Sequence, residues 1–258
     1  MLARRAVLKA LASAPLAAVP LAAVLADPRL AHAAAESLET IHIVTHGGRA
    51  VAGALARPEA APAASVLLVH EWWGLNDQIK SVAAELAQQG YGALAVDLYD
   101  GAVTSDADEA RALMQAADPD ASRDVLASWI PWLRAQDGAS GKIGTVGWCI
   151  GGGWSLNASL VRPVDATVIY YGNVAKTAAE LGSLEGPVLG HFATRDGWIT
   201  SAMVADFEAA LEEAGKAHTL HWYEADHAFA NPTSARYDAE DAALAWRRTL
   251  SFFQENLS

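Results

Sequence analysis

Cysteine is the scarcest residue of this 258-residue chain, which contains only Cys149. One cysteine excludes a disulfide within the chain. Basic residues are also few, since 18 lysines and arginines stand against 30 acidic residues and give a net charge of −12 at pH 7. An acidic chain of this kind disfavours nucleic acids and anionic membrane surfaces as partners. The oligomeric state is left open by the sequence.

No internal repeat, charge block or long linker divides the chain. The Ala/Pro stretch from Ala56 to Ala64 is too short to separate two domains. We therefore expect a single domain over residues 34–258, preceded by a leader over residues 1–33.

The leader has the three parts of an export signal. Arg4-Arg5 opens it, a long Ala/Leu/Val/Pro run follows, and Ala31-His32-Ala33 is a small-x-small cleavage site. The paired arginines resemble a twin-arginine signal, which predicts a periplasmic or secreted protein, with a cut after Ala33 or after Ala35. An uncleaved membrane anchor is the alternative, but Pro15 and Pro20 interrupt the apolar run, so no stable anchor is expected after cleavage.

Export would change the net charge of the chain and the interpretation of its single cysteine. Cleavage after Ala33 would leave 225 residues with a net charge of −15. An exported protein meets oxidising conditions, in which an unpaired thiol is exposed to oxidation. A free Cys149 in that compartment is therefore better explained by a chemical role than by packing alone.

Short apolar runs alternate with amphipathic stretches along most of the chain. Leu38–Thr45 and Arg49–Ala56 flank a His-Gly-Gly turn and predict an opening β-hairpin. Strands are predicted at Val66–His70, Ala93–Asp97, Ile143–Gly147, Ala166–Tyr170, Val188–Phe192 and Thr219–Tyr223. Helices are predicted at 77–89, 105–117, 121–136, 151–160, 177–182, 200–215 and 236–255. This alternation indicates an α/β fold with a mostly parallel central sheet and helices on both faces, whose functional residues gather at the carboxyl ends of the strands.

Cys149 lies at the centre of a Gly-x-Cys-x-Gly turn between a predicted strand and a predicted helix. Gly147 and Gly151 remove the side chains that would clash in so sharp a reversal, which is the requirement of a nucleophile elbow. The start of the following helix is expected to favour the thiolate. The alternative is a buried structural cysteine beside a glycine-rich packing turn.

A cysteine nucleophile needs a base and an orienting acid, and the chain offers both in order. His227 lies in a loop between the last predicted strand and the last predicted helix, and Asp196 directly follows a buried strand. The order nucleophile, acid, histidine is typical of hydrolase triads on α/β sheets. Asp226 is a weaker candidate for the acid, because adjacent side chains diverge.

Glu71 directly follows the first predicted parallel strand. The loop in this position supplies one amide of an oxyanion hole in such folds, so the N–H groups of Trp72 and Ile150 are the expected donors. A carboxylate near the thiol would hold it neutral until a substrate arrives. His70-Glu71 also suggests a metal site, but no second histidine follows at helical spacing, so no metal is expected.

These motifs together resemble the dienelactone hydrolase family over residues 40–256. They are Gly-x-Cys-x-Gly-Gly around Cys149, His-Glu-x-x-Gly around Glu71, Asp97-Leu98-Tyr99, Tyr170-Tyr171-Gly172, Asp196 and His227-Ala228-Phe229. The resemblance implies an α/β-hydrolase fold and a triad in which Cys149 attacks a carbonyl, His227 moves the proton and Asp196 orients the imidazole. It also implies that Glu71 contacts the resting thiol, that the intermediate is a thioester, and that no metal or organic cofactor takes part.

The sequence departs from the family where an arginine is expected to hold a substrate carboxylate. Asn231 stands shortly after the His-x-Phe motif, and Asp100-Gly101 follows Asp97-Leu98-Tyr99 without an arginine. Losing a guanidinium contact leaves an anion poorly held. We therefore expect an aromatic, mainly apolar pocket for a neutral or weakly polar ester or lactone. Besides Asn231, the candidate substrate-binding residues are Tyr99, Trp148, Tyr171, Trp198 and Phe229.

Three functions remain compatible with the sequence. The leading one is hydrolysis of an ester or lactone, and acyl transfer to an acceptor other than water is the second. The third is a non-catalytic binding or redox-responsive protein that uses the same fold as a pocket. The distance between Cys149 and its two proposed partners separates the third from the others.

Overall fold

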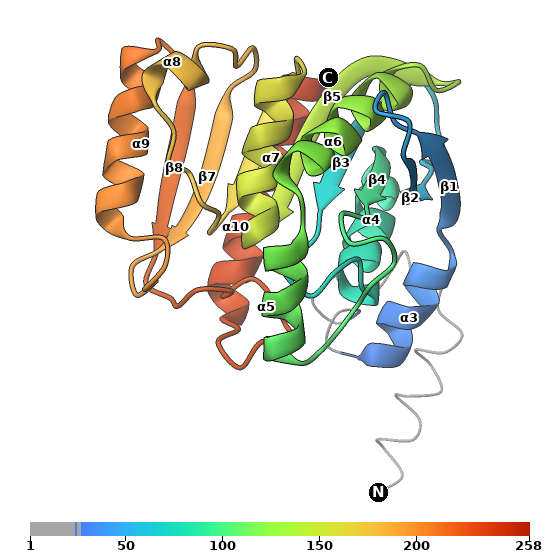
Figure 1. The fold of residues 1–258 in the computed structure, drawn as a ribbon, viewed down its shortest axis with the longest axis horizontal. Helices are drawn as coiled ribbons and strands as arrows, with labels where there is room; N and C mark the ends of the chain where they lie inside the picture. Colours follow the sequence, from blue (N-terminus) through green and yellow to red (C-terminus); the bar gives the residue numbers. More distant parts are fainter. Residues whose placement is uncertain (1–23, 25–26) are drawn as a thin grey trace, which may run out of the picture.

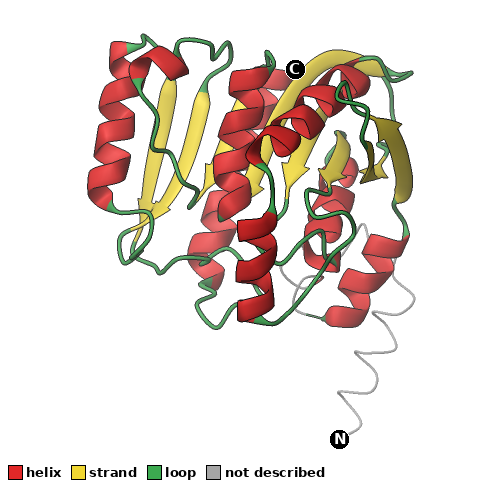
Figure 2. Cartoon of the chain, in the orientation of Figure 1, coloured by secondary structure: helices red, strands yellow, loops and turns green. Residues whose placement is uncertain are grey.

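The computed structural model describes residue 24 and residues 27–258, and its core is an eight-stranded sheet in the order β1-β2-β4-β3-β5-β6-β7-β8 (Figures 1 and 2). The pairs β1–β2 and β2–β4 are antiparallel, and every other neighbouring pair is parallel. The strands are β1 (Glu39–Val44), β2 (Ala50–Ala56), β3 (Ala63–Val69), β4 (Gly92–Val96), β5 (Ala139–Trp148), β6 (Ala166–Tyr170), β7 (Val188–Ala193) and β8 (His218–Tyr223).

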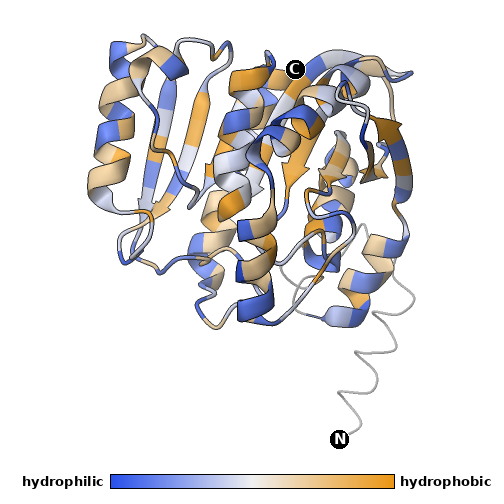
Figure 3. Cartoon of the chain, in the orientation of Figure 1, coloured by the Kyte–Doolittle hydropathy of each residue, from blue (hydrophilic) through white to orange (hydrophobic). Residues whose placement is uncertain are grey.

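Helices cover both faces of this sheet. Helices α4 and α10 share one apolar cluster with one face, while α6, α7 and α9 pack on the other. The central strands are buried on both sides, which is why β3 and β4 read as continuous apolar runs and are mostly orange in Figure 3. The helices are α3 (Pro28–Glu36), α4 (Asp77–Gln88), α5 (Ala107–Ala116), α6 (Pro119–Arg134), α7 (Ile150–Val161), α8 (Ala178–Leu181), α9 (Ser201–Glu213) and α10 (Ala239–Leu257).

The predicted α/β architecture and the opening hairpin are both present, and the differences lie at element ends. Helix α6 begins at Pro119 rather than at 121, because Asp118 caps it and proline is favourable in the first turn. Strand β5 begins at Ala139, four residues before its predicted start, with alternating exposure over its first residues. Helix α8 is a single turn held by a capping box between Thr177 and Glu180.

The predicted leader falls mainly on residues 1–23 and 25–26, which lie outside the described part of the chain. The predicted cleavage positions fall within α3. This helix packs on α4, where Ser81 Oγ donates to the carbonyl oxygen of Ala31 at 2.9 Å and His32 Nδ1 lies 2.8 Å from Asp77 Oδ2. Within the described residues, no helix combines the length and the apolar character needed to cross a membrane.

The parallel strands point the same way, so their carboxyl ends meet at one edge of the sheet. In Figure 1 the arrowheads of β7 and β8 point to the lower edge of the molecule. Glu71 follows β3, Cys149 follows β5, Asp196 follows β7 and His227 follows β8. The topology thus carries four residues that are distant in sequence to a common edge, as the position rule for parallel sheets predicts.

Candidate active site

Cys149 occupies a backbone conformation that few residues with side chains adopt. Its φ of 56° and ψ of −122° lie outside the helical and extended regions, and its N–H donates to the carbonyl oxygen of Tyr170 at 3.1 Å. A Cβ at Gly147 would lie 2.0 Å from the carbonyl oxygen of Gly151, and a Cβ at Gly151 would lie 2.3 Å from that of Val69. The two glycines are therefore a steric requirement of the turn that holds the thiol.

The thiol sulfur lies beside two backbone amides. The N–H groups of Ile150 and Trp72 lie near it and lower its pKa. Burial acts in the opposite direction and more strongly, and with the nearby Glu71 carboxylate it raises the pKa of Cys149 to about 12. The start of α7 acts in the direction expected, toward the thiolate, but burial and the Glu71 carboxylate outweigh it.

Glu71 is buried and its carboxylate is held by two donors. Asn231 Nδ2 donates to Oε2 at 2.6 Å and the Tyr171 hydroxyl donates to Oε1 at 3.3 Å. The Asn231 amide has a fixed orientation, because its Oδ1 accepts from the N–H and the hydroxyl of Thr233 at 2.9 and 2.7 Å. Burial raises the pKa of Glu71, and the hydrogen bond from Asn231 opposes that rise. Burial is the larger effect, so the pKa of Glu71 stays above its usual value although both of its oxygens accept hydrogen bonds.

His227 and Asp196 form a short, partly buried pair. His227 Nδ1 lies 2.6 Å from Asp196 Oδ2. The other oxygen, Asp196 Oδ1, accepts from the N–H groups of Trp198 and Ile199 at 2.8 and 3.0 Å. Burial works against ionisation of Asp196, but the hydrogen bonds from His227 and from the two amides lower its pKa overall. Since Nδ1 is engaged, Nε2 is the ring nitrogen left for chemistry.

Asp226, the alternative acid, pairs with Arg195 instead of His227. Its Oδ2 lies 3.5 Å from Nε of Arg195, and both side chains are about half exposed. The structure therefore assigns the histidine's carboxylate partner to Asp196, as the chain order favoured.

His70 has a structural role that the sequence did not reveal. It is fully buried, its Nδ1 lies 2.6 Å from the carbonyl oxygen of Glu71, and its Nε2 accepts from the Leu98 N–H at 3.2 Å. An acceptor on one side and a donor on the other set the neutral tautomer with the proton on Nδ1. Burial lowers the pKa of His70, which keeps it neutral. The ring thus ties the loop after β3 to the end of β4.

A cavity of about 810 Å³ opens at this edge of the sheet and is lined by the thiol and the imidazole together. Of the predicted residues it includes Glu71, Trp72, Cys149, Ile150, Tyr171, Trp198, His227 and Asn231. Trp198 lies edge-on to the His227 ring, with centroids 5.1 Å apart. The cavity is of a size that suits a small organic substrate.

Three residues predicted to bind substrate lie outside this lining. Trp148, the last residue of β5, is buried and stacks on Tyr170 in the core. Phe229 is fully buried between Tyr171 and Tyr223. Tyr99 lines a second, smaller cavity instead. Proximity in sequence to a catalytic group did not give proximity to the substrate cavity.

Two arginines line the large cavity although neither lies in a family motif. Arg111 comes from α5 and is paired with Asp108 at 3.1 Å. Arg236 comes from the loop before α10, and its guanidinium lies 5.4 Å from the centre of the Trp198 ring. The expectation of an aromatic, mainly apolar lining is therefore incomplete, because it took no account of chain segments that approach from elsewhere. The described residues contain no group of three or more His, Cys, Asp or Glu side chains suited to a metal ion.

Comparison with known proteins agrees with this architecture. Residues 51–257 match the dienelactone hydrolase family. The chain belongs to that family. It is 32% identical to the carboxymethylenebutenolidase of Pseudomonas putida over 228 residues, which cover 83% of this chain and 95% of the relative. A probable 2-oxo-3-(5-oxofuran-2-ylidene)propanoate lactonase from Bradyrhizobium is 29% identical, covering 86% and 95%.

A solved structure shows the same fold. The putative dienelactone hydrolase of Klebsiella pneumoniae superposes with a TM-score of 0.76 at 26% identity, covering 84% of this chain and 98% of that one. The protein is thus an α/β-hydrolase-fold enzyme that cleaves ester or lactone bonds.

Proposed function

We propose that this enzyme cleaves its ester or lactone through a Cys149-His227-Asp196 triad and a thioester acyl-enzyme. The observation that carries the proposal is that the Cys149 thiol and the His227 imidazole line one cavity, while His227 Nδ1 is held 2.6 Å from Asp196. A nucleophile, a base and an orienting acid in one site are the elements of covalent acyl transfer.

The amides of Trp72 and Ile150 are proposed to form the oxyanion hole. At rest they lie near the thiol sulfur and lower its pKa. A substrate carbonyl oxygen that takes these two donors would displace the sulfur from them toward the imidazole. The amides then stabilise negative charge as it develops on that oxygen, which is the most effective use of fixed donors.

The proposed reaction then follows in two halves. The thiol proton passes to His227 Nε2 as Sγ forms a bond to the carbonyl carbon, and the tetrahedral intermediate expels the alcohol oxygen, which takes the proton from the imidazolium. Water, deprotonated by His227, next attacks the thioester and releases the acid and the thiol. Asp196 stabilises the imidazolium in both halves. Glu71, beside the sulfur, disfavours the thiolate until substrate binds.

The high pKa of the thiol argues against the redox-responsive alternative. Redox-sensing cysteines are exposed and have a lowered pKa, because the thiolate is the form that oxidants attack. Cys149 is only partly exposed, in a cavity wall, and its pKa is raised to about 12. Acyl transfer uses the same first half-reaction, so the identity of the acceptor is an outcome of the test below.

The test is turnover of 4-nitrophenyl acetate by wild type, Cys149→Ala and His227→Ala. We expect kcat to fall by on the order of 10³-fold or more in each variant, as for other triads. His42→Ala, an exposed histidine on β1, is the matched control and should keep wild-type activity. Mass spectrometry of the wild-type enzyme quenched in acid during turnover should show one acyl group, which Cys149→Ala should lack. Full activity of Cys149→Ala would refute the triad.

We also propose that the chain is exported, on the leader sequence alone. Cellular fractionation and the mass of the purified native protein test this. Loss of 33 or 35 residues and recovery outside the cytoplasm are expected, whereas an intact N-terminus in the cytoplasmic fraction contradicts it.

A further inference from the structure

A second ion pair accompanies the pair that His227 forms with Asp196. Arg195 and Asp226 are the chain neighbours of those two residues, and Nε of Arg195 lies 3.5 Å from Oδ2 of Asp226. The inner pair is shielded from solvent, with side chains 11% and 0% exposed, whereas the side chains of the outer pair are 51% and 47% exposed. The loops that follow β7 and β8 are thus joined twice, once beside the cavity and once at the surface.

The backbone brings the two loops to this point side by side. The N–H of Thr194 donates to the carbonyl oxygen of Tyr223 at 2.9 Å, and the N–H of Arg195 donates to that of Ala225 at 3.0 Å. These bonds continue the parallel pairing of β7 and β8 beyond the ends of the strands. No backbone hydrogen bond joins the two loops further along, although both are fully described, so side-chain contacts hold residues 226 and 227 against the loop after β7.

The residue after His227 has a backbone conformation that costs energy. Ala228 has a φ of 67°, in the left-handed region that a residue with a Cβ rarely adopts. Such a conformation persists only where the surrounding structure holds it. On its carboxyl side the chain is anchored by Phe229, which is fully buried, and on its amino side by the two side-chain pairs. Loss of the outer pair would let the chain relax at Ala228 and move the imidazole.

Arg195 also lies near the far end of the same loop. Asp241 is in the first turn of α10, directly after the loop of residues 224–238. Arg195 and Arg248 both oppose the rise in the pKa of Asp241 that burial and two neighbouring carboxylates cause. The guanidinium of Arg195 therefore has a carboxylate near it at each end of the loop. Neither Arg195 nor Asp226 lines the large cavity, so neither touches a substrate bound there.

We propose that Arg195 and Asp226 are positioning residues, which hold the imidazole of His227 at its acid by tying together the loops after β7 and β8. This rests on the proposed function, because it assigns the two residues to the position of the base. Asp226 acts through the loop and takes no part in proton transfer. The alternative is a direct electrostatic effect on the imidazolium, which Asp226 would stabilise and Arg195 would destabilise.

Turnover of 4-nitrophenyl acetate distinguishes the two effects. Arg195→Gln and Asp226→Asn remove opposite charges but the same ion pair. If the pair holds the imidazole, each variant lowers kcat about two- to fivefold, the range set by the contribution of an exposed ion pair, and the double variant is no slower than the slower single one. KM should stay within about twofold of wild type. Opposite effects of the two variants on kcat, or additive losses in the double variant, would overturn the proposal.

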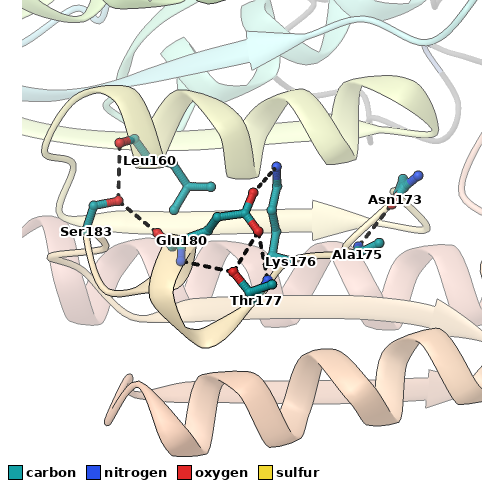
Figure 4. A network of polar contacts seen from close by, with 7 residues as sticks. All are labelled: Leu160, Asn173, Ala175, Lys176, Thr177, Glu180 and Ser183. Carbon is teal, nitrogen blue, oxygen red and sulfur yellow. Dashed lines mark hydrogen bonds and ion pairs between the residues drawn. The ribbon is translucent and has the colours of Figure 1, made fainter.

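Salt provides a second test, because it screens exposed charges. Raising sodium chloride from about 0.05 to about 1 M should lower the kcat of wild type toward that of Asp226→Asn and leave the variant unchanged. Glu180→Gln is the matched control, since it removes a carboxylate from an ion pair at α8, where Lys176 Nζ lies 3.3 Å from Glu180 Oε1 (Figure 4). It should keep the kcat and the salt response of wild type. An equal salt response in wild type and Asp226→Asn contradicts the proposal.

The tautomer of the His227 ring tests the positioning role without turnover. Nitrogen chemical shifts in histidine-labelled protein show which ring nitrogen carries the proton, and His227→Gln assigns the signals. At about pH 8 the proton should lie on Nδ1 in wild type, held by Asp196, and both variants should show a mixture of tautomers. If no ester is cleaved, the proposed function fails, but a mixture confined to the Arg195 and Asp226 variants still supports their positioning role. The same tautomer in wild type and both variants, or a mixture in wild type, refutes that role.

Discussion

Replacing Glu71 by glutamine should lower the pKa of Cys149 while reducing esterase activity. The thiol has a pKa of about 12, for which burial is the largest cause and the Glu71 carboxylate the second. Glutamine keeps the size of the side chain and removes its charge, so burial remains. A neighbouring charge shifts a pKa by about 1–3 units, and we expect a fall at the lower end of this range, to about 10–11.

The size of the change in reactivity follows from two opposing effects. At pH 8 a pKa of about 12 leaves roughly 1 thiol in 10⁴ ionised, and a fall of 1–2 units raises that fraction about 10- to 100-fold. The intrinsic nucleophilicity of a thiolate falls with its pKa, with a Brønsted coefficient of about 0.5. Alkylation by iodoacetamide should therefore accelerate only about 3- to 10-fold. Ester turnover should fall, because the carboxylate beside the sulfur is lost.

Two measurements on one sample check this prediction. The difference in ultraviolet absorbance between each protein and its Cys149→Ser counterpart isolates the thiolate from the six tyrosines and gives the pKa, and mass spectrometry gives the alkylation rate of the single cysteine. Glu208→Gln removes an equal charge from the exposed face of α9 and should change neither. An unchanged or higher thiol pKa in Glu71→Gln would show that Glu71 does not hold the thiol neutral.

Three further predictions follow from the same contacts. Asn231→Leu removes the 2.6 Å hydrogen bond to Glu71, so the pKa of Glu71 should rise and the acidic limb of the kcat/KM pH profile should move to higher pH; an unmoved limb contradicts this. Gly151→Ala places a Cβ 2.3 Å from the carbonyl oxygen of Val69 and should give little folded protein by circular dichroism, whereas Gly197→Ala, with nothing within 4 Å, should fold normally. His191 is buried with a pKa well below 6.5, so the folded state binds no proton there where the unfolded state does, and this lowers the free energy of unfolding by about 1.4 kcal/mol for each pH unit below 6.5. Buried His70 acts in the same direction, so His191→Gln should reduce the slope in urea titrations by that amount and leave the rest.

The positions of the proposed triad were predictable because they depend on backbone topology. Cys149, Asp196 and His227 each follow a strand, and parallel strands bring their carboxyl ends together whatever the side chains between them are. The glycines at 147 and 151 mark a turn that a side chain would block. Alternation of apolar runs with helices was sufficient to predict the architecture for the same reason.

The protonation state of the thiol was not predictable, because it depends on how deeply the sulfur is buried. Helix position alone favoured the thiolate, whereas desolvation and the Glu71 carboxylate reverse that preference. The structural role of His70 was also not predictable. Its position after β3 was visible, but its two hydrogen bonds reach the Glu71 carbonyl and Leu98, and the second partner is 28 positions away in the chain.

Which residues line the cavity was not predictable from the sequence either, because it depends on the paths of the segments that cross the cavity. Trp148 and Phe229 are adjacent or close to catalytic groups in sequence and are buried in the core, while Arg111 and Arg236 are remote from every motif and line the cavity. A catalytic centre on strand ends is set by the sheet, whereas α5 and the loop before α10 approach the cavity from outside it. Substitutions at Arg111 or Arg236 should therefore change which ester is cleaved while leaving the thiol chemistry intact, whereas substitutions at Glu71 or Asn231 should do the reverse.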